Sequence, residues 1–398
     1  MLPEIAVVGA GTMGAGIAQL ALEHGHPVRL IDLDRTATER ARSRITDGVG
    51  RRLLRRGQTV GTLASARARI LARLQLGVDV AEAAAASLVI EAVVERLDVK
   101  QALFARLDRL VADDAILATN TSALSVGAIA AAATGHPDRV IGLHFFNPAP
   151  IMPLVEVVAG PWTASTVVDA AAALVDGWSR TPIRCTDEPG FVVNRVNRPF
   201  TIQALRLLET GQASTGQIDA AARSEGFPMG PFELMDLVGI DVNLAATTGI
   251  WNGFGRPERF RPSTIQADLV AAGRLGRKTG EGFYRYDSNG ARLGPAPEFE
   301  GAVDAARLAD QALAVIEVIR LALANEAFLA LDAGVAADEA TIDLALRLGA
   351  NHPQGPFAWA RGRGLAGVVA ALERLSAGDA ESFEPAPGLR RAARTIAT

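Results

Sequence analysis

The sequence predicts an α/β fold in which a Rossmann-type, doubly wound domain comes first and an all-α helical domain follows in two copies. Short apolar runs typical of buried strands alternate with helical segments in the first half of the chain. From about Glu188 the chain changes to long helices with scarcely a strand. A pattern of turn residues in that helical part then recurs nearer the C-terminus, which indicates a duplication.

The N-terminal elements form a β-α-β unit. Residues 5–8 are predicted to be a short buried strand, and residues 9–14 (Gly-Ala-Gly-Thr-Met-Gly) lead into an amphipathic helix that Gly25 ends. Val28 to Asp32 is predicted to be the next strand, and a long arginine-rich helical stretch is expected over 35–75. Further strands that alternate with helices are predicted at residues 88–92, 116–118 and 140–143. Because strands alternate with helices, we expect the sheet to be parallel.

The helical part is predicted to begin with a helix from Asn194 to Gly211, in which Pro199 is a kink or a first-turn residue. Two landmarks recur with closely similar spacing: Ile218-Asp219 and Pro231-Phe232 reappear as Ile342-Asp343 and Pro356-Phe357. We therefore predict two related helical units.

The expected domains are 1–187 for nucleotide binding, 188–286 for the helical domain, 312–375 for its second, partial copy and 376–398 for a loosely held tail. Residues 288–299, which are rich in glycine and proline, are expected to be a linker.

Composition excludes several classes of protein. With 398 residues, 49% of them hydrophobic, the chain can bury a large core. A net charge of -4 and a pI near 5.8 argue against nucleic acid or an anionic membrane surface as the main partner. The single cysteine, Cys185, excludes intrachain disulfides and a multi-thiolate metal site, and it fits a reducing compartment. No apolar run approaches the roughly 18 residues of a membrane span, so a cytoplasmic protein is expected.

Nearly all of the basic residues are arginines. Of 40 lysines and arginines, only Lys100 and Lys278 are lysines, which leaves 38 arginines. A compact ammonium group does not replace a planar guanidinium, so these two lysines are candidate site residues.

The glycine motif predicts a dinucleotide site. Gly9 permits a tight turn, Gly11 lets the backbone approach a pyrophosphate and Gly14 allows close packing of helix and strand. Asp32, at the end of the second strand, would bind the ribose hydroxyls and repel a 2′-phosphate, which favours NAD over NADP. Because Arg29 and Arg35 lie nearby, NADP is not excluded. The alternative interpretation of Asp32 is a solvated carboxylate at the end of a strand.

His144 ends a predicted strand, where open α/β sheets bind their ligands. Glu156 follows it by twelve residues in an alternating apolar strand, and a buried carboxylate needs a partner. The two residues together fit a general base and the carboxylate that stabilises its imidazolium form. A histidine satisfied within the core is the alternative.

Several motifs that follow one another along the chain together resemble those of a known family. Besides Gly9 to Gly14 they are Glu91 to Glu95, Asn120 to Ser122, Leu143 to Pro148, Glu188 to Arg195 and Gly230 to Phe232. Together they resemble the 3-hydroxyacyl-CoA dehydrogenase family from the N-terminus to Tyr286. Residues 312 to about 375 resemble the family's C-terminal domain, as in longer bacterial members that carry it twice. The stretch from Gly226 to Asp236 is most similar to 3-hydroxyadipyl-CoA and 3-hydroxybutyryl-CoA dehydrogenases of bacterial catabolism.

The resemblance implies a mechanism. His144 would take the proton from the substrate's 3-hydroxyl group, and Glu156 would hold its tautomer. Ser122 would hydrogen-bond the 3-oxygen, and Asn194 would reach the substrate's carbonyl region. Each of the last two has an alternative interpretation as a helix cap or turn residue.

The resemblance also assigns binding residues. The cofactor set consists of Gly9, Gly11, Thr12, Met13, Gly14, Asp32, Glu95, Lys100, Asn120, Asn147 and Lys278. Where the family has a serine and a lysine for coenzyme A, this chain has Gly48 and Arg55, so Arg51, Arg52 and Arg55 are the candidates for the CoA phosphates. A solvated charged face is the alternative for these arginines, and a solvated pair is the alternative for Glu95 and Lys100.

The predicted activity is NAD-dependent oxidation of a short-chain L-3-hydroxyacyl-CoA in fatty acid metabolism. Two other functions remain open from sequence: a dehydrogenase of a non-CoA hydroxy acid, and a non-catalytic dinucleotide-binding protein. Because single-copy members of the family dimerise through the helical domain, we expect either a monomer with an internal pseudo-dimer or a homodimer.

Overall fold

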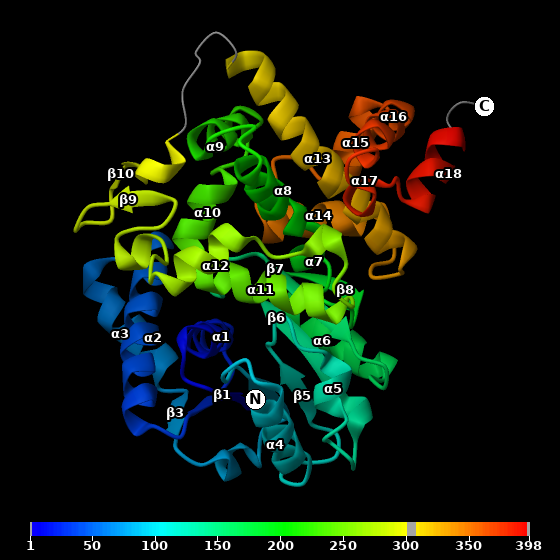
Figure 1. The fold of residues 1–398 in the computed structure, drawn as a ribbon. Coiled ribbons are helices and arrows are strands. Elements are labelled where there is room, and N and C mark those ends of the chain that lie inside the picture. Colours follow the sequence, from blue (N-terminus) through cyan, green and yellow to red (C-terminus); the bar gives the residue numbers. More distant parts are fainter. Residues whose placement is uncertain (1, 301–307, 396–398) are drawn as a thin grey trace. The chain divides into compact units, whose positions relative to one another are not determined.

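The computed structural model describes residues 2–300 and 308–395, with the backbone alone for 308–314. The chain divides into two compact units, of which the first ends at Glu188 and the second begins at Pro189 (Figure 1). Of the predicted tail, residues 396–398 lie outside the described part of the chain.

The first unit is built on an eight-stranded sheet whose strand order is β3-β2-β1-β4-β5-β6-β7-β8. The strands are β1 (Ile5–Val8), β2 (Val28–Ile31), β3 (Leu74–Gly77), β4 (Leu88–Glu91), β5 (Ile116–Thr119), β6 (Val140–Phe145), β7 (Leu154–Ala159) and β8 (Thr181–Thr186). Its α-helices are α1 (Thr12–Glu23), α2 (Arg35–Arg55), α3 (Val60–Leu71), α4 (Leu97–Asp108), α5 (Val126–Ala130) and α6 (Ser165–Gly177). Strands β2 and β3 lie on one side of β1, and β4 and the later strands lie on the other, so the strand order switches direction between β1 and β4. Open α/β sheets bind ligands at such a switch point.

Two predictions for this unit need correction, and one strand was not predicted. The sheet is mixed, because β6 and β7 pair antiparallel. The helix expected over 35–75 ends at Arg55, since Gly57 adopts a φ of +85°, and α3 and then β3 follow it. Strand β8, which the sequence analysis missed, lies at the sheet edge and contains Pro182, a residue that edge strands tolerate.

The second unit is mainly helical. Its α-helices are α7 (Val193–Val196), α8 (Arg198–Glu209), α9 (Thr215–Ser224), α10 (Pro231–Val238), α11 (Ile240–Gly253), α12 (Thr264–Ala271), α13 (Leu308–Asp332), α14 (Glu339–Gly349), α15 (Pro356–Arg363), α16 (Leu365–Ser376), α17 (Ala380–Phe383) and α18 (Pro387–Thr395). Pro199 lies in the first turn of α8, one of the two positions expected for it. Figure 1 shows α13 as a long gold helix beside α8, and the two helices pack together.

The duplication is visible in the backbone of this unit. Asp219 accepts hydrogen bonds from the backbone N–H groups of Phe232 and Glu233, at 3.0 and 3.1 Å. Asp343 accepts from Phe357 N and Ala358 N in the same way, at 2.8 and 2.9 Å. In each copy a carboxylate therefore holds the first turn of the helix that begins with Pro-Phe.

Two further expectations were wrong in the second unit. The segment expected to be a linker contains β10 (Arg292–Pro295), which pairs antiparallel with β9 (Tyr284–Tyr286). The tail expected to be loosely held forms α17 and α18, and Phe383 and Leu389 are buried. Apolar residues at helical spacing hold these short segments against the rest of the unit.

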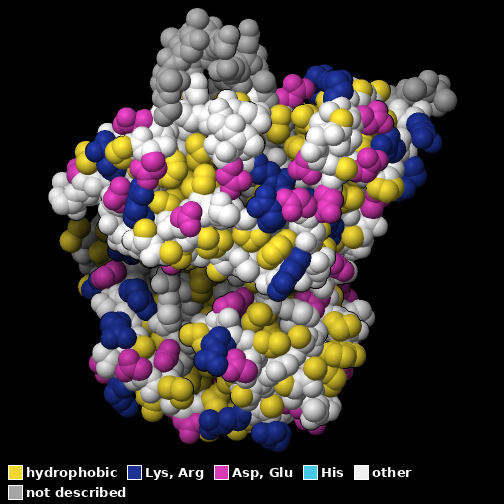
Figure 2. Space-filling view, viewed as in Figure 1, with side chains coloured by type: hydrophobic (Ala, Val, Ile, Leu, Met, Phe, Trp, Pro, Cys, Tyr) yellow, Lys and Arg dark blue, Asp and Glu magenta, His cyan; other side chains and the backbone are white. Residues whose placement is uncertain are grey.

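Charge is dispersed on the visible surface. Figure 2 shows dark blue basic and magenta acidic side chains interspersed on the face that it presents. Within the described residues, no helix is both long and apolar enough to span a membrane.

Candidate active site

The glycine loop between β1 and α1 is shaped for a dinucleotide. Gly9 has a φ of +107°, and a Cβ atom on Gly14 would lie 1.8 Å from the carbonyl oxygen of Gly9. Gly11 is exposed at the N-cap of α1, and within the described residues no side chain caps that helix. The helix N-terminus therefore presents backbone N–H groups where a pyrophosphate binds in this fold. Thr12 and Met13 are its first residues.

Asp32 follows β2 beside the glycine loop. Its Oδ2 accepts a hydrogen bond from Ala10 N at 2.8 Å, and its Oδ1 accepts one from Asp34 N at 3.2 Å. These bonds orient the carboxylate next to the turn that would hold the pyrophosphate. The residues of this chain thus fit an NAD molecule.

His144 and Glu156 face each other across the antiparallel pair β6 and β7, where they are register partners. His144 Nδ1 lies 2.6 Å from Glu156 Oε2, and both side chains are buried, at 7% and 0% exposed. An ionised carboxylate only accepts hydrogen bonds, so Nδ1 carries the proton in this pair. In the neutral form of the ring, Nε2 would then be the nitrogen able to accept a proton. The ring of Phe146 packs 4.6 Å from that of His144.

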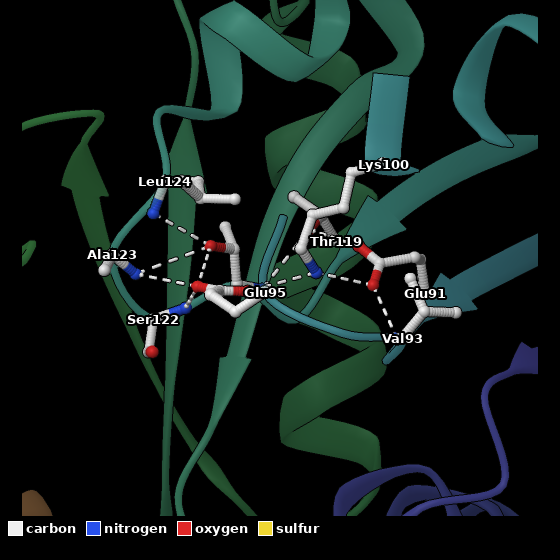
Figure 3. Close-up of polar contacts among 9 residues, drawn as sticks. Glu91, Val93, Glu95, Lys100, Thr119, Ser122, Ala123 and Leu124 are labelled. Carbon is white, nitrogen blue, oxygen red and sulfur yellow. Dashed lines mark hydrogen bonds and ion pairs between the residues drawn. The ribbon is translucent and has the colours of Figure 1, made fainter. Parts of the chain in front are cut away.

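The loop after β5 is anchored to the neighbouring strands. Asn120 Oδ1 accepts from Phe145 N at 2.9 Å, which ties the loop to the end of β6. Glu95 Oε1 accepts from Thr121 Oγ1 at 2.5 Å and from Ser122 N at 3.0 Å. In Figure 3 the Ser122 hydroxyl points away from the Glu95 carboxylate. The loop is therefore held through its backbone, with the serine side chain directed elsewhere.

Lys100 lies at the centre of the polar cluster in Figure 3. Its Nζ is 2.6 Å from Glu91 Oε1 and 3.2 Å from Glu95 Oε2, and the lysine is only 1% exposed. Glu91 also accepts from Thr119 Oγ1 and Val93 N. The solvated helix pair considered for Glu95 and Lys100 is therefore wrong. Glu91, at 0% exposed, was missed by the sequence analysis as a member of this cluster, although a glutamate ending an apolar strand is a usable signal.

The pKa of Glu95 is lowered. Burial acts to raise it, but the Lys100 ammonium and the hydrogen bonds from Thr121 and Ser122 outweigh that cost. The carboxylate is thus held ionised at neutral pH, as its role in binding the loop requires.

Two other candidates lie in the second unit. Lys278 pairs with Asp241 at 2.5 Å and is 43% exposed, so its setting differs from that of Lys100. Asn194 lies in α7 and is half-buried. Asn147, in the first unit, is exposed after the end of β6.

The predicted CoA arginines line a cleft of about 650 Å³ in the first unit, within the usual size range of ligand sites. Arg51 and Arg55 are exposed on α2. Arg52 is half-buried instead: its Nε pairs with Glu23 Oε2 at 2.8 Å, and it also donates to the carbonyl oxygen of Pro150. Thr12 and Asn147 line the same cleft.

The cleft contains polar residues that the sequence analysis missed. Arg180 donates to Pro150 O at 2.6 Å, and burial followed by the neighbouring Arg52 lowers its pKa. A Cβ atom on Gly48 would lie 2.1 Å from Gln19 Oε1, so Gln19 fills the space beside that glycine. Arg180 is distant in sequence from α2, which explains why no local pattern revealed it.

Comparison with known proteins shows the family to which the chain belongs. The model described as "3-hydroxyacyl-CoA dehydrogenase, NAD binding domain" matches residues 4–188. The model described as "3-hydroxyacyl-CoA dehydrogenase, C-terminal domain" matches residues 190–286 and again 315–395. The chain belongs to the 3-hydroxyacyl-CoA dehydrogenase family. It is an NAD-dependent oxidoreductase, its substrate is an acyl-CoA, and the family's C-terminal domain occurs in two segments.

Individual members of the 3-hydroxyacyl-CoA dehydrogenase family resemble it closely. The 3-hydroxyadipyl-CoA dehydrogenase of Escherichia coli K12 is 38% identical over 93% of each chain. The mitochondrial hydroxyacyl-coenzyme A dehydrogenase of Rattus norvegicus is 40% identical over 72% of this chain and 92% of its own. A crystal structure of 3-hydroxybutyryl-CoA dehydrogenase from E. coli K12 aligns with a TM-score of 0.86 at 38% identity and covers 99% of both chains.

Proposed function

We propose that this dehydrogenase oxidises a short-chain L-3-hydroxyacyl-CoA, either 3-hydroxybutyryl-CoA or 3-hydroxyadipyl-CoA, and that His144 is the general base. The observation that carries this proposal is the buried 2.6 Å contact between His144 and Glu156. A base for an alcohol proton must accept it near neutral pH and be stabilised once charged. Glu156 supplies that stabilisation from a fully buried position.

His144 takes the 3-hydroxyl proton on Nε2 as the C3–H bond breaks, and it becomes an imidazolium. Glu156 keeps the proton on Nδ1 and compensates the new positive charge. Bound NAD supplies the acceptor for the hydride that leaves C3. In the reverse direction the imidazolium returns the proton to the 3-oxygen, so the same pair serves both directions.

Ser122 and Asn194 orient the substrate in this proposal. The Ser122 hydroxyl donates to the 3-oxygen, and the backbone bonds to Glu95 hold the loop that presents it. Asn194 hydrogen-bonds the carbonyl region of the thioester. Orientation of this kind supplies much of the rate in a hydride transfer, because the reacting carbons must lie roughly 3–3.5 Å apart.

The cofactor residues divide by role. Gly9, Gly11 and Gly14 shape the pyrophosphate site, and Asp32 binds the adenosine ribose hydroxyls. Glu95 and Asn120 hold the loop that lies next to the reaction, Lys100 holds Glu95, and Asn147 lies after β6. Lys278 is proposed as a cofactor residue from the family resemblance alone.

The exposed arginines Arg51 and Arg55 are proposed to bind the CoA phosphates, with Arg52 fixing the wall of the cleft through Glu23. Guanidinium groups on one helix face suit bidentate contacts to phosphate oxygens. Their place beside one cleft supports this role over that of a solvated face.

The acyl chain is best identified by kinetics. The experiment measures kcat/KM for acetoacetyl-CoA, a longer 3-oxoacyl-CoA and 3-oxoadipyl-CoA, each with NADH and with NADPH. The proposal expects the highest values for acetoacetyl-CoA or 3-oxoadipyl-CoA with NADH. A preference for the longer chain, or for NADPH, would contradict it.

We also propose that the second helical copy packs on the first as an internal pseudo-dimer, so that the enzyme is a monomer. Contacts of α13 with α8 and α9 within the second unit support this. Light scattering is expected to give the mass of one chain, and the mass of two would show that the repeat leaves another interface free. The boundaries 1–187, 188–286 and 312–375 stay part of this proposal, whereas the residues expected to be a tail contain α17 and α18 and lie within the second match to the C-terminal domain.

Cys185 has no chemical role in the proposal. Burial, together with the nearby Glu156 carboxylate, raises the pKa of its thiol well above the ordinary value. The thiol therefore stays protonated, and the residue suits a reducing compartment such as the cytoplasm.

A further inference from the structure

The turn that carries Asn194 is tightly formed at its start. Gly190 and Phe191 both adopt left-handed backbone conformations, with φ values of +79° and +49°. Arg195 N then donates to the carbonyl oxygen of Gly190 at 3.0 Å. A non-glycine residue in this region is strained, so the surrounding contacts have to maintain the turn.

The first such contact comes from the second repeat. Arg195 Nε donates to Glu326 Oε1 at 2.8 Å, and both side chains are 3% exposed. Arg259 Nε binds the other oxygen of Glu326 at 3.1 Å. The guanidinium of Arg195 also lies 4.8 Å from the ring centre of Phe254. A carboxylate on α13 therefore holds the residue that follows Asn194, and it does so in a buried setting where ion pairs are little screened.

The second contact lies three residues after Asn194. Asn197 Oδ1 is 2.8 Å from His352 Nε2, and because a carbonyl oxygen only accepts, the histidine donates. His352 packs edge-on against Phe227 with ring centres 5.0 Å apart. Burial, followed by the charge of Arg320, lowers the pKa of His352 to about 3. The imidazole is therefore neutral, and its one N–H group is the Nε2–H that donates to Asn197.

We propose that the second helical repeat positions the substrate-binding asparagine, with Glu326 and His352 as positioning residues that hold Arg195 and Asn197, the first and third residues after Asn194. The two contacts come from separate places in the repeat, one in α13 and one in the loop between α14 and α15. This assigns the second copy a part in substrate orientation. The inference rests on the proposed contact of Asn194 with substrate.

A double-mutant cycle tests the proposal in the full-length enzyme. Glu326→Gln keeps the shape of the side chain and removes its charge, and Asn194→Ala removes the group that it is proposed to position. We expect Glu326→Gln to lower kcat/KM for acetoacetyl-CoA about tenfold while the Kd for NADH stays within about twofold. In the Asn194→Ala background, the same substitution should cost less than about twofold, because residues that act through one group are not additive.

Asp379→Asn is the matched control. It breaks another ion pair between the repeats, Arg206 Nη1 to Asp379 Oδ2 at 2.8 Å, which does not involve the turn at Asn194. Its kcat/KM should stay within about twofold of the wild type. A loss equal to that of Glu326→Gln would overturn the proposal, since any weakening of the repeat would then suffice.

His352 provides a second route if Glu326→Gln does not fold. His352→Gln retains a donor for Asn197 and should keep most of the activity, whereas His352→Leu should lose about as much as Glu326→Gln. Equal activity of these two variants would overturn the proposal. If Asn194→Ala has wild-type kinetics, its proposed role fails together with the inference. If Asn194→Ala is impaired but the losses in the cycle multiply, only the inference fails.

Discussion

The two lysines of the chain form ion pairs of similar length, one buried and the other partly exposed. Comparing them tests how much the buried cluster in Figure 3 contributes to the stability of the fold. Lys100 lies 2.6 Å from Glu91, with both side chains buried, whereas Lys278 lies 2.5 Å from Asp241 with both side chains partly exposed. Lys100→Met and Lys278→Met remove the same charge and keep a similar stem. Breaking a buried pair on one side costs about 3–5 kcal/mol, and an exposed pair contributes about 0–1 kcal/mol.

The assay is equilibrium unfolding in urea, followed by circular dichroism. For Lys100→Met, a loss of about 3 kcal/mol corresponds to a fall in the midpoint of about 1 M or more, if the slope is near 3 kcal/mol/M. The loss of unfolding free energy should lie toward the lower end of the range of about 3–5 kcal/mol, because Glu91 keeps its hydrogen bonds from Thr119 and Val93. Lys278→Met should shift the midpoint by less than about 0.3 M. Equal shifts in the two variants would refute the reasoning from burial.

Three further predictions concern binding and pH. Arg55→Glu should raise the KM for acetoacetyl-CoA at least tenfold and leave the Kd for NADH nearly unchanged, and an unchanged KM would argue against the CoA assignment. Asp32→Ala should shift the ratio of kcat/KM for NADPH and NADH at least tenfold toward NADPH, whereas a constant ratio would exclude Asp32 from cofactor choice. Because burial lowers the pKa of His352 to about 3 from 6.5, stability is lost as the pH falls below 6.5. Between pH 7 and pH 5 the wild type should lose about 2 kcal/mol more than His352→Gln in urea unfolding, and parallel curves would disprove this.

Local sequence patterns correctly predicted those elements of the fold that depend on neighbouring residues alone. The glycine turn at Gly9 and the strand at β4 follow from backbone freedom and apolar runs, and both were predicted. The edge strands β3 and β8 were not, because a partly exposed strand with few apolar residues lacks the usual signal. The antiparallel placement of β7 was also missed, since pairing direction depends on the path of the connection and not on the strand's own residues.

The site shows the same division. The contact between His144 and Glu156 was predicted from strand position and from the need of a buried carboxylate for a partner, and their catalytic roles stay a proposal. The ion pairs of Lys100 with Glu91 and Glu95 were not, since they depend on where α4 places a side chain relative to two loops. Contacts between distant segments, such as Arg195 with Glu326, leave no mark that one sequence reveals.

The central claim is that His144 is the base of an NAD-dependent 3-hydroxyacyl-CoA dehydrogenase. The most direct measurement compares His144→Gln with the wild type in acetoacetyl-CoA reduction, followed by NADH absorbance, with NADH binding determined separately by fluorescence titration. The account predicts that kcat falls by about two to four orders of magnitude while the Kd for NADH stays within about twofold. Turnover close to that of the wild type would contradict it.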